Sequence, residues 1–170
     1  MGEVFVNRLS KFLPNDPVSN DDIELYLGMV DGKPSRARLK ILGNNKITSR
    51  YYAIDKSGKS THTNAQLAAR AIEGLLDENF TKNDIQLLTG CTMSTEQLLP
   101  SHTAMVHGEL GCPPIEISSI SSSCASGFQA MKYAWLSVKH GDINNAVAFA
   151  SEKVSTWLRH DKFDAETEKL

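Results

Sequence analysis

Between residues 63 and 151, short apolar segments alternate with segments of helical periodicity, and this alternation restricts the fold more than any other feature. The expected helices cover residues 63–76, 101–110 and 125–140, and the expected strands cover 85–89, 115–118 and 145–151. Such alternation through short turns is typical of a parallel or mixed, mostly parallel sheet with helices on both faces. We therefore predict an α/β fold.

Residues at the expected helix ends support these boundaries. Thr63 and Gln66 have the spacing of a capping box, in which two side chains satisfy free backbone N–H groups at a helix start. Gly111 and Gly141 follow the other two helices, where glycine commonly ends a helix. Each helix therefore has a recognisable end of its own.

The first 61 residues are less regular. Residues 4–6 (Val-Phe-Val) predict an opening strand, and Ser19 or Asn20 is expected to cap a short helix. Residues 29–61 are polar, basic and contain glycines, and we interpret them mostly as loop.

Length and charge exclude several classes of function. The chain has 170 residues, with 18 Lys and Arg against 20 Asp and Glu, which gives a net charge of −2. This length predicts one domain, and the charge balance offers no surface for nucleic acid. No apolar run reaches the ~18 residues of a membrane span, and the first residues do not resemble a secretory signal. We expect a cytoplasmic protein without nucleic-acid or membrane partners.

The chain has three cysteines, Cys91, Cys112 and Cys124. An odd number without an export signal argues against a disulfide framework. No paired Cys or His spacing indicates a metal site, and we expect neither a metal nor a bound cofactor. The question is therefore whether one of the three is a nucleophile.

Cys124 is the candidate, because it lies between an expected strand and an expected helix. That junction is above the carboxyl end of a strand, where open α/β sheets bind ligands, and at a helix N-terminus, which favours a thiolate. The small residues Ala125, Ser126 and Gly127 allow a sharp turn, as in a nucleophile elbow, and nearby N–H groups are suited to an oxyanion hole. The alternative, that Cys124 is a small buried hydrophobic residue, stays open from chemistry alone.

The sequence shows no base for this nucleophile. The five histidines have no partner pattern, and we interpret all of them as surface or capping residues: His62, His102, His107, His140 and His160. For Cys91 and Cys112 a structural role is the better interpretation.

Four motifs, in order along the chain, resemble one family. They are Phe12-Leu13-Pro14 with Asn20-Asp21, Leu99-Pro100-Ser101 with Leu110-Gly111, the nucleophile segment Ser123 to Ala130, and His140-Gly141 leading to Ala148. Together they resemble thiolase-fold condensing enzymes of the 3-oxoacyl-[acyl-carrier-protein] synthase III type. The resemblance covers almost the whole chain.

The resemblance implies a fold of two similar α/β halves, of which residues 1–170 are the N-terminal, thiolase-like one. It implies that Cys124 accepts an acyl group from a coenzyme A or acyl-carrier-protein thioester. A malonyl thioester then loses carbon dioxide, and its carbanion attacks the acyl-cysteine in a Claisen condensation. Fatty acid, related lipid or polyketide biosynthesis would use this reaction.

The family's His and Asn, which act on the malonyl thioester, have no match here, because they belong to the second half. We therefore expect the chain to be a truncated N-terminal part, inactive by itself as a condensing enzyme. The family's Trp-containing segment that stacks on coenzyme A also has no counterpart, and residues 33–38 stand in its place. The choice of acyl donor is expected to differ accordingly.

The resemblance also implies substrate-binding residues and a partner. Leu99 takes the position of the residue that limits acyl-chain length in a partner's channel, and Met93 and Phe128 are the other substrate-binding candidates. For Leu99 and Met93, simple packing against the helix from Ser101 is nearly as good an interpretation. The family forms a homodimer through the strand before the nucleophile, here residues 115–120.

Two other functions remain as alternatives. A non-catalytic half that pairs with another chain would explain the missing His and Asn. A nucleotide-binding domain is disfavoured, because the chain has neither a GxGxxG nor a GxxxxGK[ST] motif.

Overall fold

The computed structural model describes residues 2–163 of the chain. Two compact units are present in this part of the chain, one of residues 2–12 and 63–152 and the other of residues 13–62 and 153–163. Each unit is treated by itself below.

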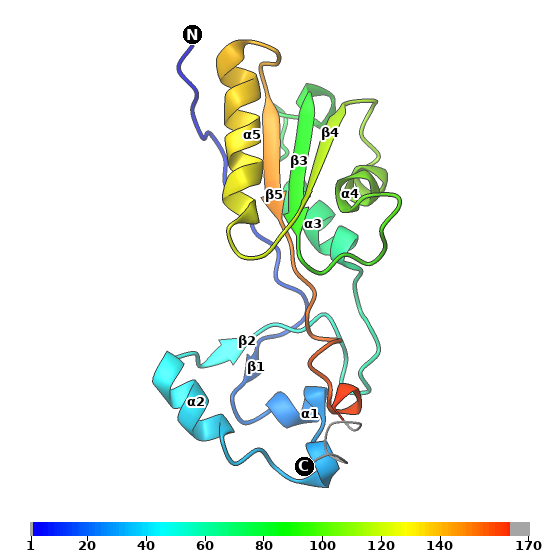
Figure 1. Cartoon of the computed structure of the whole chain (residues 1–170). Helices are drawn as coiled ribbons and strands as arrows, with labels where there is room; N and C mark the ends of the chain where they lie inside the picture. Colours follow the sequence, from blue (N-terminus) through cyan, green and yellow to red (C-terminus); the bar gives the residue numbers. More distant parts are fainter. Residues whose placement is uncertain (1, 164–170) are drawn as a thin grey trace. The chain divides into compact units, whose positions relative to one another are not determined.

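The first unit is built on a three-stranded parallel sheet in the order β4-β3-β5 (Figure 1). The strands are β3 (Leu87–Thr92), β4 (Glu116–Ser121) and β5 (Ala146–Ala150). All six residues of β3 are buried, because β3 is paired on both sides and covered on both faces. The α/β prediction and its three strands are confirmed.

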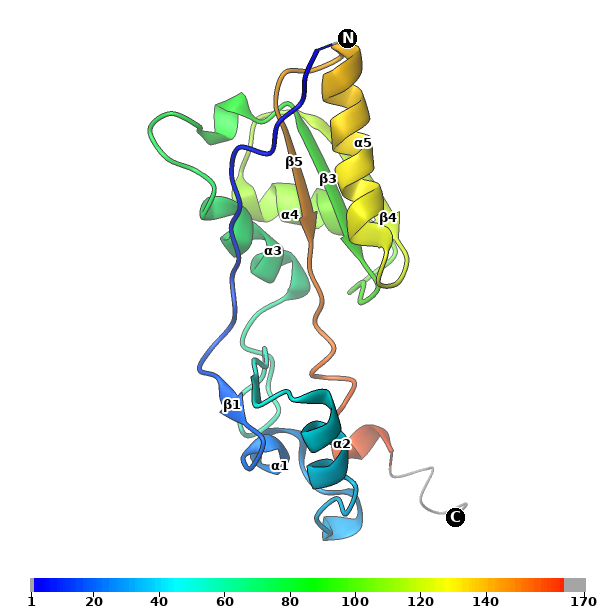
Figure 2. The same ribbon diagram turned by 90° about the vertical axis from the view of Figure 1, so that its left-hand side faces the viewer.

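Three helices cover this sheet. They are α3 (Asn64–Glu73), α4 (His102–Leu110) and α5 (Ser126–His140). Figures 1 and 2 show α5 on one face of the sheet and α3 and α4 on the other. The core between the sheet and helices α3 and α4 contains mostly small and branched side chains: Ala65, Ala68, Ile72, Leu88, Val106, Leu110, Val147 and Phe149.

The predicted helix ends are confirmed. Thr63 accepts from the N–H of Gln66 while the Gln66 side chain accepts from the N–H of Thr63, which completes the capping box. Gly111 and Gly141 both have positive φ, at 61° and 83°. A non-glycine residue adopts this conformation at a cost, and these two positions therefore end α4 and α5.

The strand predicted at residues 4–6 is wrong. This segment pairs with no strand in the described chain, and Phe5 and Val6 are exposed. Arg8 holds the segment instead, through an ion pair with Asp77 at 2.5 Å and a hydrogen bond to the carbonyl oxygen of Leu75. Side-chain contacts such as those of Arg8, rather than a strand ladder, thus attach the N-terminal residues.

The second unit contains a two-stranded antiparallel sheet of β1 (Val18–Ser19) and β2 (Ser49–Arg50). The prediction was of one mixed, mostly parallel sheet. In the structure the three-stranded sheet is wholly parallel, and the antiparallel pair forms a separate sheet. Helices α1 (Ile23–Leu27) and α2 (Arg38–Asn45) complete this unit, together with short 3₁₀ turns. Its small core consists of Val18, Tyr52 and Ile54, with Tyr26 and Leu27 against them.

Residues 29–61 are mostly loop, as predicted, although they contain α2 and β2. Helix α2 has no side-chain cap at Ala37 and contains Gly43, so its sequence lacks the usual helix signals. The cap predicted for α1 is wrong, because the residue at the cap position is Asp22. The hydroxyl of Ser19 accepts from the N–H of Asp22 at 3.2 Å and donates to its Oδ2 at 2.7 Å.

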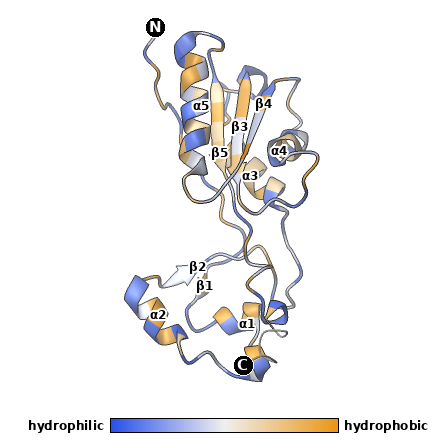
Figure 3. Cartoon of the chain, viewed as in Figure 1, coloured by the Kyte–Doolittle hydropathy of each residue, from blue (hydrophilic) through white to orange (hydrophobic). Residues whose placement is uncertain are grey.

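No helix in the described part of the chain is long and apolar enough to cross a membrane. Figure 3 shows that β3 and β5 are the more hydrophobic strands of the first unit and that β4 is more polar. Strand β4 is an edge strand with mostly exposed or half-buried residues, including Ile117.

Candidate active site

The three parallel strands bring their carboxyl ends to one edge of the sheet. Thr92 at the end of β3 lies opposite Ser121 at the end of β4, and Cys91 lies opposite Ala150 at the end of β5. The segments that leave these strands therefore meet at this edge, which is where open α/β sheets bind ligands.

Cys124 lies in the turn that connects β4 to α5. The hydroxyl of Ser126 organises this turn by donating to the carbonyl oxygens of Ser122 and Ser123, at 3.0 and 2.9 Å. Ser126 is buried, whereas Cys124 is exposed. The turn thus presents the thiol outward, two residues before the first helical residue of α5.

Gly127 is less important for this turn than its sequence position suggests. A Cβ atom at Gly127 would lie 3.6 Å from the Cβ of Ala150 and 3.9 Å from the Sγ of Cys91, which are ordinary contacts. These distances also show that the first turn of α5 packs against the ends of β3 and β5.

The other two cysteines have less accessible thiols. Cys91 is only 3% exposed, beneath α5. Burial raises the pKa of the Cys112 thiol, and the nearby Lys82 opposes this only in part. Since the thiolate is the nucleophile, both are poorer candidates than Cys124.

The three predicted substrate-binding residues are exposed side chains near the same edge. Met93 directly follows β3, Leu99 is 85% exposed in the segment before α4, and Phe128 is 76% exposed in the first turn of α5. The structure brings their segments to one end of the sheet, and none of the three lines either of the two cavities described below.

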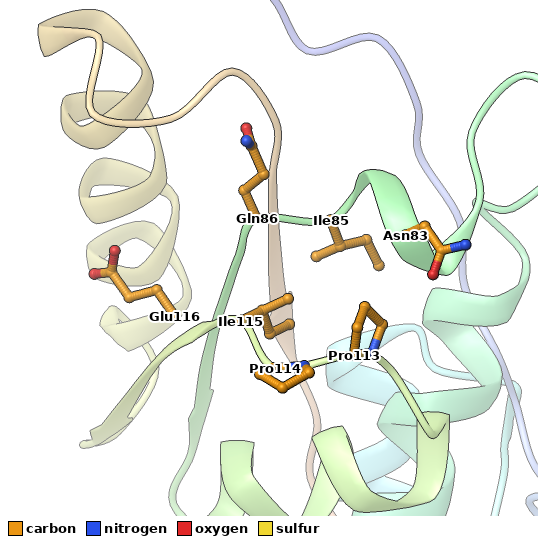
Figure 4. Close-up of a pocket in the computed structure, with 7 residues that line it drawn as sticks. All are labelled: Asn83, Ile85, Gln86, Pro113, Pro114, Ile115 and Glu116. Atoms are coloured by element: carbon orange, nitrogen blue, oxygen red, sulfur yellow. The ribbon is translucent and has the colours of Figure 1, made fainter.

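The cavity in Figure 4 lies at the opposite, amino-terminal edge of the sheet. Its volume is about 490 Å³, and its lining residues precede or begin β3 and β4: Asn83, Ile85, Gln86, Pro113, Pro114, Ile115 and Glu116. No predicted site residue lines it. It is therefore unrelated to the chemistry expected of Cys124.

The second unit has a separate cavity of about 520 Å³ with mainly apolar walls. Lys33, Pro34, Ser35 and Arg38, all within residues 33–38, contribute to its lining. The guanidinium of Arg38 forms an ion pair with Glu24 at 2.9 Å.

A polar cluster of buried and exposed residues, which the sequence interpretation missed, lies at the ends of β3 and β5. At its centre, Oε1 of Glu152 accepts from the N–H of Met93 at 2.7 Å, and Oε2 accepts from the N–H and hydroxyl of Ser94 at 3.0 and 2.6 Å. Hydrogen bonds to a charged group contribute about 1.5–3 kcal/mol each. Glu152 therefore fastens the loop after β3 to the end of β5.

Asn64 adds α3 to this cluster. It is the first residue of α3 and is fully buried. Its amide nitrogen lies 2.9 Å from the hydroxyl of Thr92, 3.2 Å from the carbonyl oxygen of Ser94 and 3.3 Å from that of Ser151. One side chain thus connects the start of α3 to the ends of two strands.

The interpretation of His102 as a surface or capping residue is wrong. Its side chain is buried, its Nε2 lies 2.8 Å from the hydroxyl of Ser151, and its ring lies 5.8 Å from that of Phe149. Phe149 in turn covers Gly90, where a Cβ would come within 2.0 Å of the Phe149 ring. Nδ1 of His102 is buried without a hydrogen-bond partner in the described structure.

The other histidines are exposed or partly buried, and Nε2 of His107 lies 2.9 Å from the backbone oxygen of Pro113. Within residues 2–163, no group of three or more His, Cys, Asp or Glu side chains is arranged to hold a metal ion.

Among curated proteins, the chain is 25% identical over 144 residues to a beta-ketoacyl-[acyl-carrier-protein] synthase III of Anaplasma marginale, a match that covers 85% of this chain and 41% of the relative. It is 26% identical over 150 residues to the enzyme of that name from Ehrlichia ruminantium, with 88% of this chain and 44% of the relative covered. No protein-family model matches. The chain is similar to the N-terminal half of synthase III.

Solved structures show the same fold. A tetronic acid condensing enzyme, AbyA1, aligns over 89% of this chain and 44% of its own, with a TM-score of 0.72 and 24% identity. Synthase III of Aquifex aeolicus aligns over 86% of this chain and 44% of its own, with a TM-score of 0.69 and 22% identity. The chain therefore has the fold of a thiolase-type half-domain and spans less than half the length of these relatives.

The burial of His102 predicts a specific pH dependence of stability. Burial lowers the pKa of His102 below its ordinary 6.5, although the charges of Glu96 and Glu152 partly oppose this. The unfolded chain therefore binds a proton at higher pH than the folded chain, and stability falls as the pH drops below about 6.5, by up to ~1.4 kcal/mol per pH unit. Urea unfolding at pH 7.5 and pH 5.5 measures this loss.

His102→Gln is expected to reduce the difference between the two pH values. His140→Gln, the same change on the exposed end of α5, is the matched control. An equal pH dependence in the parent and His102→Gln would show that His102 is not the group responsible.

Proposed function

We propose that the chain is the N-terminal half of a 3-oxoacyl-[acyl-carrier-protein] synthase III-like acyltransferase, with Cys124 as its nucleophile. The observation that carries the proposal is an exposed cysteine in the turn between a strand and a helix, at the carboxyl edge of a parallel sheet. The similarity of most of the chain to such synthases supports it. We place the enzyme in the cytoplasm, in fatty acid or related lipid or polyketide biosynthesis.

The reaction has two stages. The Cys124 thiolate attacks the carbonyl carbon of an acyl thioester, and the coenzyme A or carrier-protein thiolate leaves. A malonyl thioester then loses carbon dioxide, and its carbanion attacks the acyl-cysteine carbonyl. A carbon–carbon bond forms, the Cys124–acyl bond breaks, and the 3-oxoacyl thioester is released.

The His and Asn that donate hydrogen bonds to the malonyl thioester in the family are proposed to belong to a second half of the protein. A face of α5 supports this division, because Phe128, Met131 and Trp135 lie at helical spacing and are exposed in the described chain. Apolar side chains gathered on one face of a helix are typical of an interface. In this proposal the thioesters are substrates, and no further cofactor or metal takes part.

The same exposed faces favour the alternative of a non-catalytic half that only pairs with another chain. Edge strand β4 and the apolar face of α5 both offer surfaces for such pairing. The two functions differ in one respect, since only the enzyme requires a covalent acyl group on Cys124.

Mapping of the acylated residue tests the proposed function. The intact two-half enzyme is incubated with a labelled acyl thioester, digested, and analysed by mass spectrometry. We expect the label on Cys124 and its loss in Cys124→Ala. Label on Cys91 or Cys112 would contradict the assignment, and an unlabelled enzyme would favour the non-catalytic alternative.

We also expect the protein to form a homodimer in which β4 pairs with β4 of a second copy. Strand β4 uses one edge to pair with β3, and no described strand pairs with its other edge. Unpaired edges are suited to pairing with a second copy. Light scattering is expected to give the mass of a dimer, with slow hydrogen exchange over residues 115–120. A monomer with rapid exchange there would contradict it.

Leu99 is proposed to line the acyl channel. Each buried methylene contributes about 0.8 kcal/mol, so a change of two methylenes in available space shifts preference more than tenfold. Leu99→Trp in the intact enzyme is expected to lower activity on long acyl donors and to spare the acetyl donor. An equal loss on both donors, or no loss, would place Leu99 outside the channel.

A further inference from the structure

Two consecutive residues after β5 hold both ends of the loop between β3 and α4. At the start of this loop, Glu152 accepts from the backbone N–H groups of Met93 and Ser94. At its end, the hydroxyl of Ser151 lies 2.8 Å from Nε2 of His102, the first residue of α4. Residues 93–101 are therefore tied at each end to Ser151 and Glu152.

The middle of the loop has one more attachment before its tip. Oε2 of Glu96 lies 3.5 Å from the N–H of Ala65, at the start of α3. Beyond Glu96 the side chains of Leu98 and Leu99 are 89% and 85% exposed. The loop thus has a hydrogen-bonded base and an apolar tip that points away from its own core.

We propose that Ser151 and Glu152 form a positioning element that selects acyl donors by fixing where the Leu98–Leu99 tip lies. This inference rests on the proposed function, in which Leu99 lines the acyl channel. Ser151 and Glu152 do not touch substrate in this account. They act through the loop.

We call Ser151 and Glu152 the anchor of the loop. The position of the loop depends on both carboxylate oxygens of Glu152, so that the loss of one acceptor atom is expected to change it. Four donor groups converge on the two oxygens of Glu152, because the Thr92 hydroxyl also lies 3.2 Å from Oε2. A glutamine keeps the shape of the side chain but accepts through only one of its two terminal atoms. Glu152→Gln therefore leaves at least one of these donors without its protein acceptor, next to the start of the loop.

The anchor also joins the loop to the sheet that carries Cys124. Ser151 and Glu152 continue β5, and the N–H of Ser151 donates to the carbonyl oxygen of Cys91 in β3 at 3.2 Å. Strand β3 is in register with β4, from which the Cys124 turn begins. A displacement of the anchor thus moves the loop tip relative to this sheet.

The test compares two anchor variants with two controls in the intact enzyme. Glu152→Gln loosens the start of the loop, and Ser151→Ala loosens its end. Ile72→Val removes a methyl group from the core of α3 and destabilises the fold elsewhere. Glu109→Gln makes the same chemical change as Glu152→Gln at an exposed position of α4.

Hydrogen exchange is the first measurement, and it does not depend on activity. In Glu152→Gln, the amides of Met93 and Ser94 are expected to exchange about tenfold faster than in the parent, relative to amides inside β3. Neither control is expected to produce this local change. Unchanged protection of both amides would overturn the proposal that Glu152 holds the start of the loop in place.

Donor selection is the second measurement. The ratio of kcat/KM for acetyl and long-chain donors is expected to move toward unity by about fivefold in both anchor variants and in neither control. General destabilisation lowers both values together and leaves the ratio unchanged. Faster loop exchange with an unchanged ratio would overturn the selection role, whereas a parent enzyme that acylates no cysteine would overturn the proposed function.

Discussion

The pairing of β3 with both of its neighbours is the constraint on which the first unit depends. Because β3 is central and wholly buried, its parallel registers with β4 and β5 place three carboxyl ends at one edge of the sheet. Every candidate for chemistry in this unit follows from that alignment. Cys124 leaves β4, Met93 leaves β3, and Ser151 leaves β5 at the same edge.

Burial of polar side chains at this edge costs free energy, and the hydrogen bonds of the polar cluster offset that cost. Asn64, Thr92, Ser94 and His102 are all buried, and an unpaired polar group in such surroundings is expensive. Hydrogen bonds among these residues and to Glu152 and Ser151 satisfy most of their polar atoms. The exceptions, Nδ1 of His102 and Oδ1 of Asn64, lie in the same cluster. A network of this kind specifies one arrangement of the loop after β3, because other arrangements would leave more groups unpaired.

The sequence predicted the regular part of the fold because local signals there agree with packing. Thr63 and Gln66 cap α3, and Gly111 and Gly141 end the next two helices, independently of tertiary contacts. Residues 4–6 have strand-like composition but no strand to pair with, and α2 lacks a cap, so local signals failed in both places. His102 was missed because its burial results from Phe149 and Ser151, which are distant in the sequence. Ser151 and Glu152 could have been found in the sequence, because they are polar residues directly after the apolar strand β5.

The central claim, that this edge of the sheet presents Cys124 as a nucleophile, can be tested on the native protein without any substrate. The measurement is the rate at which iodoacetamide modifies each cysteine, resolved by mass spectrometry. Cys124 is exposed, Cys91 is buried, and the Cys112 thiol has a raised pKa. We predict that Cys124 reacts at least ~10-fold faster than either of the others. Modification of Cys91 or Cys112 at the same rate or faster would contradict the account.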